Sequence, residues 1–93
     1  MEVKVYATLR DVVGSSTTQV DGSSEMTVDE ILNDLIARYP AMRQKLLLNG
    51  KELHPAMHIL VNGRDMRYLD GLETVVTAED EIRIFPPVGG GRQ

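Results

Sequence analysis

The residues best suited to chemistry in this sequence are the three consecutive glycines Gly89–Gly91, which follow Pro86, Pro87 and Val88. No lysine followed by serine or threonine comes after them, so they do not form a phosphate-binding loop. Because glycine has no Cβ, a narrow channel in another protein can close around this backbone and leave a terminal carboxylate accessible, so that its oxygen can attack phosphorus or its carbon can be attacked. The reacting group that the sequence predicts is therefore a backbone carboxyl group and not a side chain.

The two prolines indicate how this segment is presented. Proline favours polyproline geometry and prevents ladder pairing, so Pro86 and Pro87 are predicted to direct the glycines away from the last strand. From Pro86 to Gly91 the chain reaches at most roughly 20 Å at about 3.3 Å per residue, enough to thread a groove in a partner. The alternative is a frayed, exposed end. We predict a folded domain over residues 1–85 and a flexible tail over 86–93.

A second candidate site is a pair of aromatic residues, Tyr6 and Phe85. The alternation that buries one set of side chains in the first and last strands turns Tyr6, Thr8, Arg83 and Phe85 to the opposite face. If these strands are neighbours, Tyr6 and Phe85 form an exposed apolar patch beside the root of the tail, which is typical of an interaction surface. Packing of the two rings at a partly covered rim is the equally open alternative.

Other chemistry has little support in the residues. The chain has no cysteine, which excludes thiolate metal sites and a cysteine nucleophile. His54 and His58 lack a zinc-site pattern around them, and the acidic run 79–81 is predicted to be a solvated turn before a strand. We therefore predict no catalytic side chain and no metal site.

Size and charge limit the class of protein. A chain of 93 residues with 42% hydrophobic and 26% charged residues predicts one globular domain. Its 14 acidic and 10 basic residues give a formal charge of −4, which disfavours nucleic acid as the partner. No apolar run approaches the roughly 18 residues of a membrane span. These features predict a cytoplasmic protein that does not bind membranes.

The elements that position these candidates follow from periodicity and turn signals. Alternation predicts a strand over residues 2–10, with a weaker strand over 17–20 returning antiparallel to it across Gly14-Ser15-Ser16. Thr27-Val28-Asp29-Glu30 fits a capping box, so an amphipathic helix is expected from there until Pro40. Further strands are predicted at 58–61, 64–69 and 81–85.

The remaining signals are weaker. Residues 41–57 could hold a short second helix and a turn at Asn49-Gly50, whereas Asn62-Gly63 is a strong hairpin signal. The order of elements predicts an α+β roll, a mixed sheet of four to five strands covered on one face by one main helix.

The chain resembles the MoaD/ThiS family of ubiquitin-like sulfur carriers, and especially its archaeal small-modifier branch. The resemblance covers nearly the whole chain. Its most specific part is Ile84-Phe85-Pro86-Pro87-Val88 followed by the glycines. Further matching segments are residues 5–10, Thr27-Val28, Tyr39-Pro40, Val61-Asn62-Gly63 and Asp80-Glu81-Ile82. The resemblance implies the β-grasp, or ubiquitin-like, fold.

The same resemblance implies a function in which the carrier supplies no catalytic side chain. A partner adenylating enzyme, using ATP and magnesium, would convert the C-terminal glycine carboxylate into an acyl-adenylate. Attack by a persulfide-borne sulfur would give a thiocarboxylate for molybdopterin or tRNA sulfuration, with a molybdopterin synthase large subunit-like protein or a sulfurtransferase as partner. Attack by a lysine of a target protein would give an isopeptide-linked conjugate instead.

The sequence departs from the family pattern at its end. Such carriers commonly end in a glycine pair, and aligning the Phe-Pro-Pro-Val segment assigns that pair to Gly90 and Gly91. Arg92 and Gln93 are then a surplus extension, expected to be removed by a processing metallopeptidase. The alternative function is a β-grasp module that binds proteins through Tyr6 and Phe85 and forms no acyl bond.

Overall fold

The computed structural model describes residues 1–21 and 25–87. The expectations for residues 88–93, which include Val88, the three glycines, Arg92 and Gln93, lie outside the described residues. Residues 1–21 and 25–87 contain most of the predicted domain and the two prolines at the root of the tail. None of the helices in residues 1–21 and 25–87 has the length and apolar character needed to cross a bilayer.

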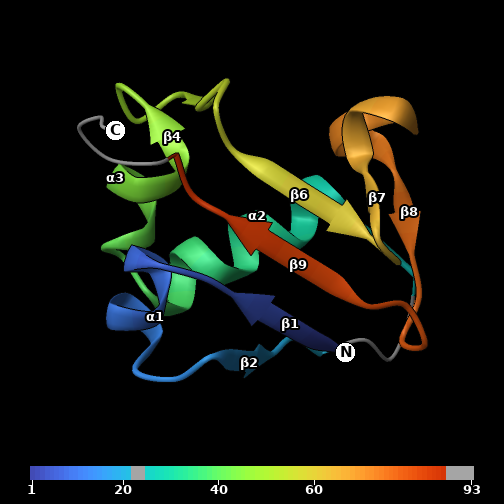
Figure 1. Ribbon diagram of the computed structural model, residues 1–93, viewed down its shortest axis with the longest axis horizontal. Coiled ribbons are helices and arrows are strands. Elements are labelled where there is room, and N and C mark those ends of the chain that lie inside the picture. The colour runs from blue at the N-terminus through green and yellow to red at the C-terminus, as the bar shows by residue number, and fades with distance from the viewer. Residues whose placement is uncertain (22–24, 88–93) are drawn as a thin grey trace.

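The centre of the fold is a mixed five-stranded sheet (Figure 1). The strands lie in the order β2 (Thr17–Gln19), β1 (Glu2–Val5), β9 (Ile82–Phe85), β6 (His58–Val61) and β7 (Arg64–Asp65). The first and last strands of the chain, β1 and β9, are parallel neighbours in the middle of the sheet, and the other pairs are antiparallel. The predicted mixed sheet and the predicted antiparallel return of residues 17–20 are confirmed.

One main helix, α2 (Val28–Arg38), covers the inner face of this sheet (Figure 1). The predicted capping box begins it: Glu30 N donates to Thr27 Oγ1 over 3.1 Å, and Thr27 N donates to Glu30 Oε1 over 2.8 Å. Val28, Ile31, Leu32 and Leu35 are buried in the core. The helix ends before Pro40, as expected, because proline has no N–H for a further helical hydrogen bond.

The prediction of a strand over residues 2–10 is wrong beyond Val5. Residues Thr8–Val13 form a short helix, α1, which ends at Gly14 in a left-handed conformation with φ 81°. Leu9 is buried as expected, but Ala7 is exposed and Thr8 belongs to the helix. Leu9, Val12 and Val13 also have helical spacing, and burying them from a helix allows the chain to turn away from the sheet.

The middle of the chain contains the short elements that the sequence left open. Helix α3 (Met42–Leu46) leads into a hairpin of β4 (Leu47–Leu48) and β5 (Glu52–Leu53), turned by Asn49 and Gly50 at φ 58° and 71°. These two positive angles are the geometry of a tight hairpin turn, which asparagine and glycine accommodate best. The predicted turn at Asn49-Gly50 is confirmed, and the short second helix that residues 41–57 could hold is α3, which ends at Leu46.

The second hairpin differs from its prediction. Asn62 and Gly63 turn the chain between β6 and β7, as expected. The returning strand stops at Asp65, because the chain bends into the 3₁₀ helix η1 (Met66–Tyr68) and buries Met66. The pairing predicted for residues 64–69 therefore extends only over Arg64–Asp65. A 3₁₀ helix η2 (Gly71–Glu73) and a small pair of strands, β3 (Met26–Thr27) with β8 (Val75–Val76), complete the described structure.

Candidate functional site

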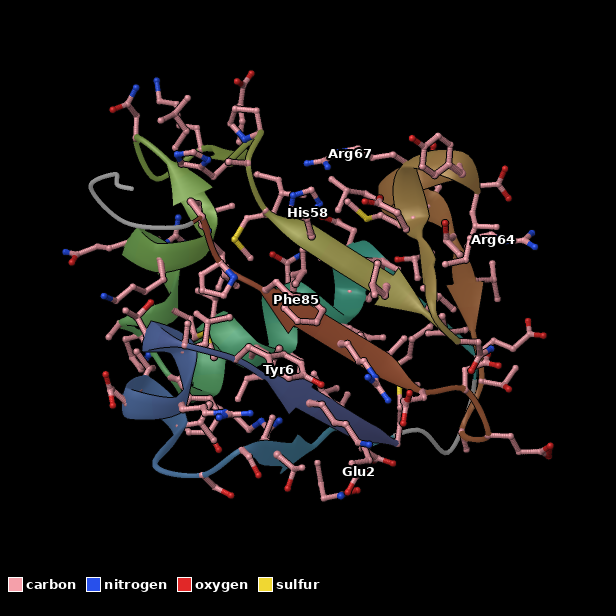
Figure 2. All side chains as sticks on the ribbon, viewed as in Figure 1. Glu2, Tyr6, His58, Arg64, Arg67 and Phe85 are labelled. Atoms are coloured by element: carbon pink, nitrogen blue, oxygen red, sulfur yellow. The ribbon has the colours of Figure 1, made fainter. Side chains whose placement is uncertain are left out.

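The two aromatic residues singled out in the sequence are in contact. Val5 and Ile84 are partners in the parallel pairing of β1 with β9, so Tyr6 and Phe85 follow them as neighbours on the outer face. Their rings stack, with centroids 4.1 Å apart and planes 10° apart. Figure 2 shows both rings lying over the outer face of the sheet. Both side chains are partly buried, because each covers the other.

A third outward-facing residue extends this pair across the sheet. His58 of β6 is the antiparallel partner of Phe85, so the three side chains span three neighbouring strands (Figure 2). They line an open depression with a cavity volume of about 500 Å³. We call it the outer groove; its lining residues are Tyr6, Ala7, His58, Leu60, Phe85 and Pro86. Most of this lining is apolar, and a groove of this kind suits docking of another protein.

The root of the tail is part of the groove. Pro86 directly follows Phe85, is buried, and lines the groove, while Pro87 is half-buried. Pro86 packs at the surface beside Phe85, and the predicted outward direction of the glycines falls outside the described residues. A partner bound in the outer groove would contact the chain immediately before the residues that lead to the glycines. The boundary between residues 85 and 86 stays a prediction; the residues on its two sides, Phe85 and Pro86, both line the groove.

Cationic side chains border the outer groove and the adjoining part of the sheet. The guanidinium of Arg10 lies 5.1 Å from the centre of the Tyr6 ring, and Arg10 Nε donates to the carbonyl oxygen of Val5 over 3.0 Å. On the same face Glu81 accepts from Arg83 Nε over 2.8 Å and from Lys4 Nζ over 3.0 Å. The hydrogen bond from Arg83, followed by that from Lys4, lowers the pKa of Glu81.

At the other end of the groove His58 belongs to a small polar cluster. Its Nδ1 lies 3.3 Å from Asp65 Oδ2 and 3.5 Å from an Arg67 guanidinium nitrogen. The backbone N–H of Arg67 donates to Asp65 and, with desolvation opposing it, lowers the pKa of that carboxyl group. Arg67 also donates to the carbonyl oxygens of Pro55 and Met57. This side chain therefore ties η1 to the segment before β6.

Several residues of the site carry no signal in the sequence that places them there. Ala7, Leu60 and Arg10 come to the groove only because the first strand ends at Val5 and β6 lies beside β9. Ala7 has φ 52° and ψ −130°, a backbone conformation that L-residues rarely adopt, and it turns the chain just after Tyr6. The hairpin signal at Asn62-Gly63 was the one indication that Leu60 and Asp65 are paired.

The remaining candidates, the two histidines and the acidic run 79–81, do not form a common site. His54 accepts from the backbone N–H of Ala56 through Nδ1, whereas His58 belongs to the groove. Within residues 1–21 and 25–87 no three histidine or acidic side chains gather in a way that could hold a metal ion. In the acidic run, Asp80 accepts from Asn62 and Thr77, and Glu81 binds the two cations named above. These contacts hold loops and strands together.

Comparison with known proteins gives consistent matches along the chain. The sequence pattern of the ThiS family matches residues 3–91. Small archaeal modifier protein 3 of Haloferax volcanii is 35% identical over 91 residues, which cover 98% of each chain. The crystal structure of SAMP1 from Haloferax volcanii superimposes with a TM-score of 0.82 at 34% identity, over 97% of each chain. A chain in the BexX/CysO complex of Amycolatopsis orientalis gives 0.79 at 31% identity, over 97% of this chain and 98% of that one.

Other relatives of similar length carry the name sulfur carrier protein. The structural matches confirm the β-grasp, ubiquitin-like fold that the resemblance implied. The chain therefore belongs to the ThiS/MoaD family of ubiquitin-like sulfur carriers and small protein modifiers.

Proposed function

We propose that this protein is a carrier whose backbone carboxyl at Gly91 is activated by a partner adenylating enzyme. Family membership supports the class of function. The observation that carries the proposal is the outer groove, in which the stacked Tyr6 and Phe85 adjoin the buried Pro86 at the root of the tail. An enzyme docked there has the segment leading to the glycines directly beside its binding surface.

The first step forms an acyl-adenylate. A carboxylate oxygen of Gly91 attacks the α-phosphorus of ATP in the partner enzyme, a new P–O bond forms, and pyrophosphate leaves with its magnesium. The carboxylate is a poor electrophile, whereas the mixed anhydride has AMP as a good leaving group. The domain contributes docking and orientation, which reduce the entropic cost of bringing the two reactants together.

The second step depends on the nucleophile. A persulfide sulfur attacks the carbonyl carbon and expels AMP; a thiol then cleaves the resulting acyl disulfide, leaving the thiocarboxylate and a new disulfide. A molybdopterin synthase-like subunit or a tRNA sulfurtransferase would accept this sulfur. A lysine amine of a target protein instead expels AMP and forms an isopeptide bond. Both routes share the adenylate, and the domain is suited to either.

Activation at Gly91 requires that Arg92 and Gln93 be absent. The match to the family pattern ends at residue 91, which leaves these two residues outside it and supports the assignment of the glycine pair to Gly90 and Gly91. A peptidase, for which we propose a metallopeptidase, would hydrolyse the bond between Gly91 and Arg92. The new carboxylate then becomes the substrate of the adenylating enzyme.

The test compares two forms of the protein with a cognate adenylating enzyme and ATP. The form that ends at Gly91 is expected to support exchange of labelled pyrophosphate into ATP, and the 93-residue form is not. Intact mass spectrometry after addition of a persulfide donor should then show replacement of one oxygen by sulfur. A form ending at Gly90 controls for the position of the carboxylate.

The opposite result favours the alternative function, a protein-binding module without acyl chemistry. If the form ending at Gly91 binds an activating enzyme but supports no exchange, the protein is a binding module that uses its outer groove without acyl chemistry. If the 93-residue form exchanges as well as the trimmed form, the proposed processing step is wrong.

A further inference from the structure

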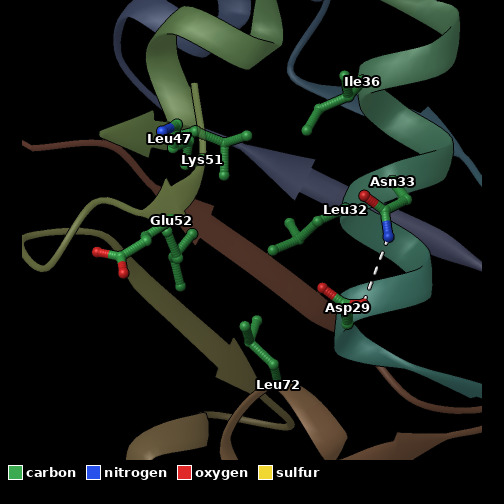
Figure 3. Close-up of a pocket in the computed structure, with 9 residues that line it drawn as sticks. Asp29, Leu32, Asn33, Ile36, Leu47, Lys51, Glu52 and Leu72 are labelled. Atoms are coloured by element: carbon green, nitrogen blue, oxygen red, sulfur yellow. Dashed lines mark hydrogen bonds between the residues drawn. The ribbon is translucent and has the colours of Figure 1, made fainter. Parts of the chain in front are cut away.

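A second pocket lies away from the outer face of the sheet. It lies between helix α2 and the β4–β5 hairpin, beside Leu72 of η2, and has a cavity volume of about 310 Å³ (Figure 3). We call it the helix–hairpin pocket. Its apolar lining consists of Leu32, Ile36, Leu47, Leu53 and Leu72. The volume of this pocket is near the low end of the range found for small-molecule sites, and it is large enough for a few side chains of a partner.

The apolar lining is bordered by two carboxylates. Figure 3 shows Asp29 on α2 and Glu52 on the hairpin, with Leu32 and Leu72 between them. Asp29 accepts a long hydrogen bond of 3.4 Å from Asn33. Neither carboxylate forms a salt bridge within residues 1–21 and 25–87. Both residues are exposed, so their charges can be paired by an incoming group.

The chemistry of the pocket selects a particular kind of side chain. Arginine and lysine bury their methylene stems on apolar surface while their charged ends reach for carboxylates. Arginine suits two separated carboxylates better than lysine, because its planar guanidinium offers five N–H donors in fixed directions. An adjacent aliphatic side chain would fill the leucine-lined part of the pocket. The one cation in the lining, Lys51, repels such a group and limits its affinity.

We propose that the helix–hairpin pocket binds a segment of a partner protein in which an arginine stands next to an aliphatic side chain. This inference is independent of acyl activation at Gly91. Helix α2 packs on the inner face of the sheet, whereas the outer groove lies on the opposite face. One protein can therefore hold the carrier by the pocket while another occupies the outer groove. The protein bound at the pocket would then present the carrier, still in complex, to the protein that binds the outer groove.

The experiment is a titration of the ¹⁵N-labelled 93-residue protein with the peptide acetyl-Leu-Arg-Leu-Arg-Leu-amide, followed by backbone amide shifts. Saturable shifts are expected in residues 29–36 and 47–53 and around Leu72. A peptide with citrulline in place of arginine keeps the shape but loses the charge. It should bind about tenfold more weakly, because two exposed ion pairs are lost.

Variants of the pocket residues test which charges contribute to peptide binding. Asp29→Asn combined with Glu52→Gln should weaken binding of the arginine peptide about tenfold, and Lys51→Gln should strengthen it about twofold. The matched control is Glu79→Gln, which removes one exposed charge away from the pocket and should change nothing. Pyrophosphate exchange by the form ending at Gly91 should be unaffected by the double variant, so the failure of one proposal is distinguishable from the failure of the other.

Four results would overturn the proposal. The shifts could centre on Tyr6 and Phe85, the citrulline peptide could bind as tightly as the arginine peptide, or millimolar peptide could give no saturable shift. The fourth result is a set of concentration-dependent shifts of the pocket residues without peptide. It would show that a second copy of this chain, and not a segment of a partner protein, occupies the pocket.

Discussion

Val5 and Ile84 lie opposite each other in the parallel pairing of β1 with β9, and both are fully buried. Because side chains alternate along a strand, this pairing turns Tyr6 and Phe85 outward as neighbours. The aromatic stack of the outer groove is therefore a consequence of strand register. A slip of one residue would bring these rings to the inner face and expose the core.

Replacing Phe85 tests the outer groove. Phe85→Asp removes the ring stack and introduces a charge into an apolar groove, so pyrophosphate exchange with the activating enzyme should fall about tenfold or more at subsaturating carrier. The free energy of unfolding should fall by only about 1–2 kcal/mol, because the ring is partly exposed. The control is Tyr68→Asp, at an aromatic that is 83% exposed and outside the groove, which should leave exchange unchanged. Complete unfolding of Phe85→Asp would contradict the assignment of Phe85 to the surface.

Replacing Ala7 tests the strained turn after Tyr6. At φ 52° and ψ −130° an L-residue is disfavoured, whereas glycine is not. Ala7→Gly should raise the free energy of unfolding by about 1 kcal/mol, measured by urea denaturation. The matched control, Ala37→Gly on the exposed face of α2, should lower it by about 1 kcal/mol, because glycine is unfavourable inside a helix. Equal destabilisation by both changes would show that Ala7 is unstrained.

Replacing Thr27 tests the start of the main helix. Thr27→Ala removes the acceptor for the Glu30 backbone N–H and should lower the free energy of unfolding by about 1 kcal/mol. Thr27→Ser keeps the hydroxyl and should stay within about 0.5 kcal/mol of the natural protein. Thermal unfolding followed by circular dichroism measures both. If the two variants are equally destabilised, the lost methyl group of threonine, and not the cap, is responsible.

Asp80 should make stability depend on acid. The hydrogen bond from Asn62 Nδ2, followed by that from the Thr77 backbone N–H, holds the pKa of Asp80 below its ordinary value of 3.8. The folded state therefore favours the ionised form, and this contribution is fully present above pH 3.8. It is lost as the pH falls through 3.8 toward the lower folded value, because the unfolded chain takes up the proton first.

The corresponding measurement is a series of urea denaturations from about pH 7 to about pH 2. Asp80→Asn should lower the free energy of unfolding by about 1–2 kcal/mol at neutral pH and reduce its decline in acid. Glu79→Gln, next to it and exposed, is the control and should leave the acid dependence as it is. An unchanged pH profile in Asp80→Asn would contradict the assigned hydrogen bonds.

Local signals in the sequence were sufficient for several elements. The capping box at Thr27, the turns at Asn49-Gly50 and Asn62-Gly63, and the alternation in residues 81–85 each specify a backbone conformation within a few residues. The cap and the two turns are formed by near neighbours along the chain, so they do not depend on the rest of the fold, whereas the strand over residues 82–85 is completed by distant partners in β1 and β6. The outward direction of Phe85 follows from the same alternation.

The sequence by itself determined which residues face outward on the last strand, where the main helix starts and stops, and that a glycine run follows Phe85-Pro86-Pro87. Only the tertiary structure decided that residues 8–13 leave the sheet as a helix, that Pro86 is packed beside Phe85, and that His58 completes the groove. The physical reason is that apolar residues at positions 5, 7, 9, 12 and 13 satisfy both a strand and a helix pattern. Which of the two patterns is adopted depends on burial against segments that are distant in the sequence, and these contacts form only when the chain folds.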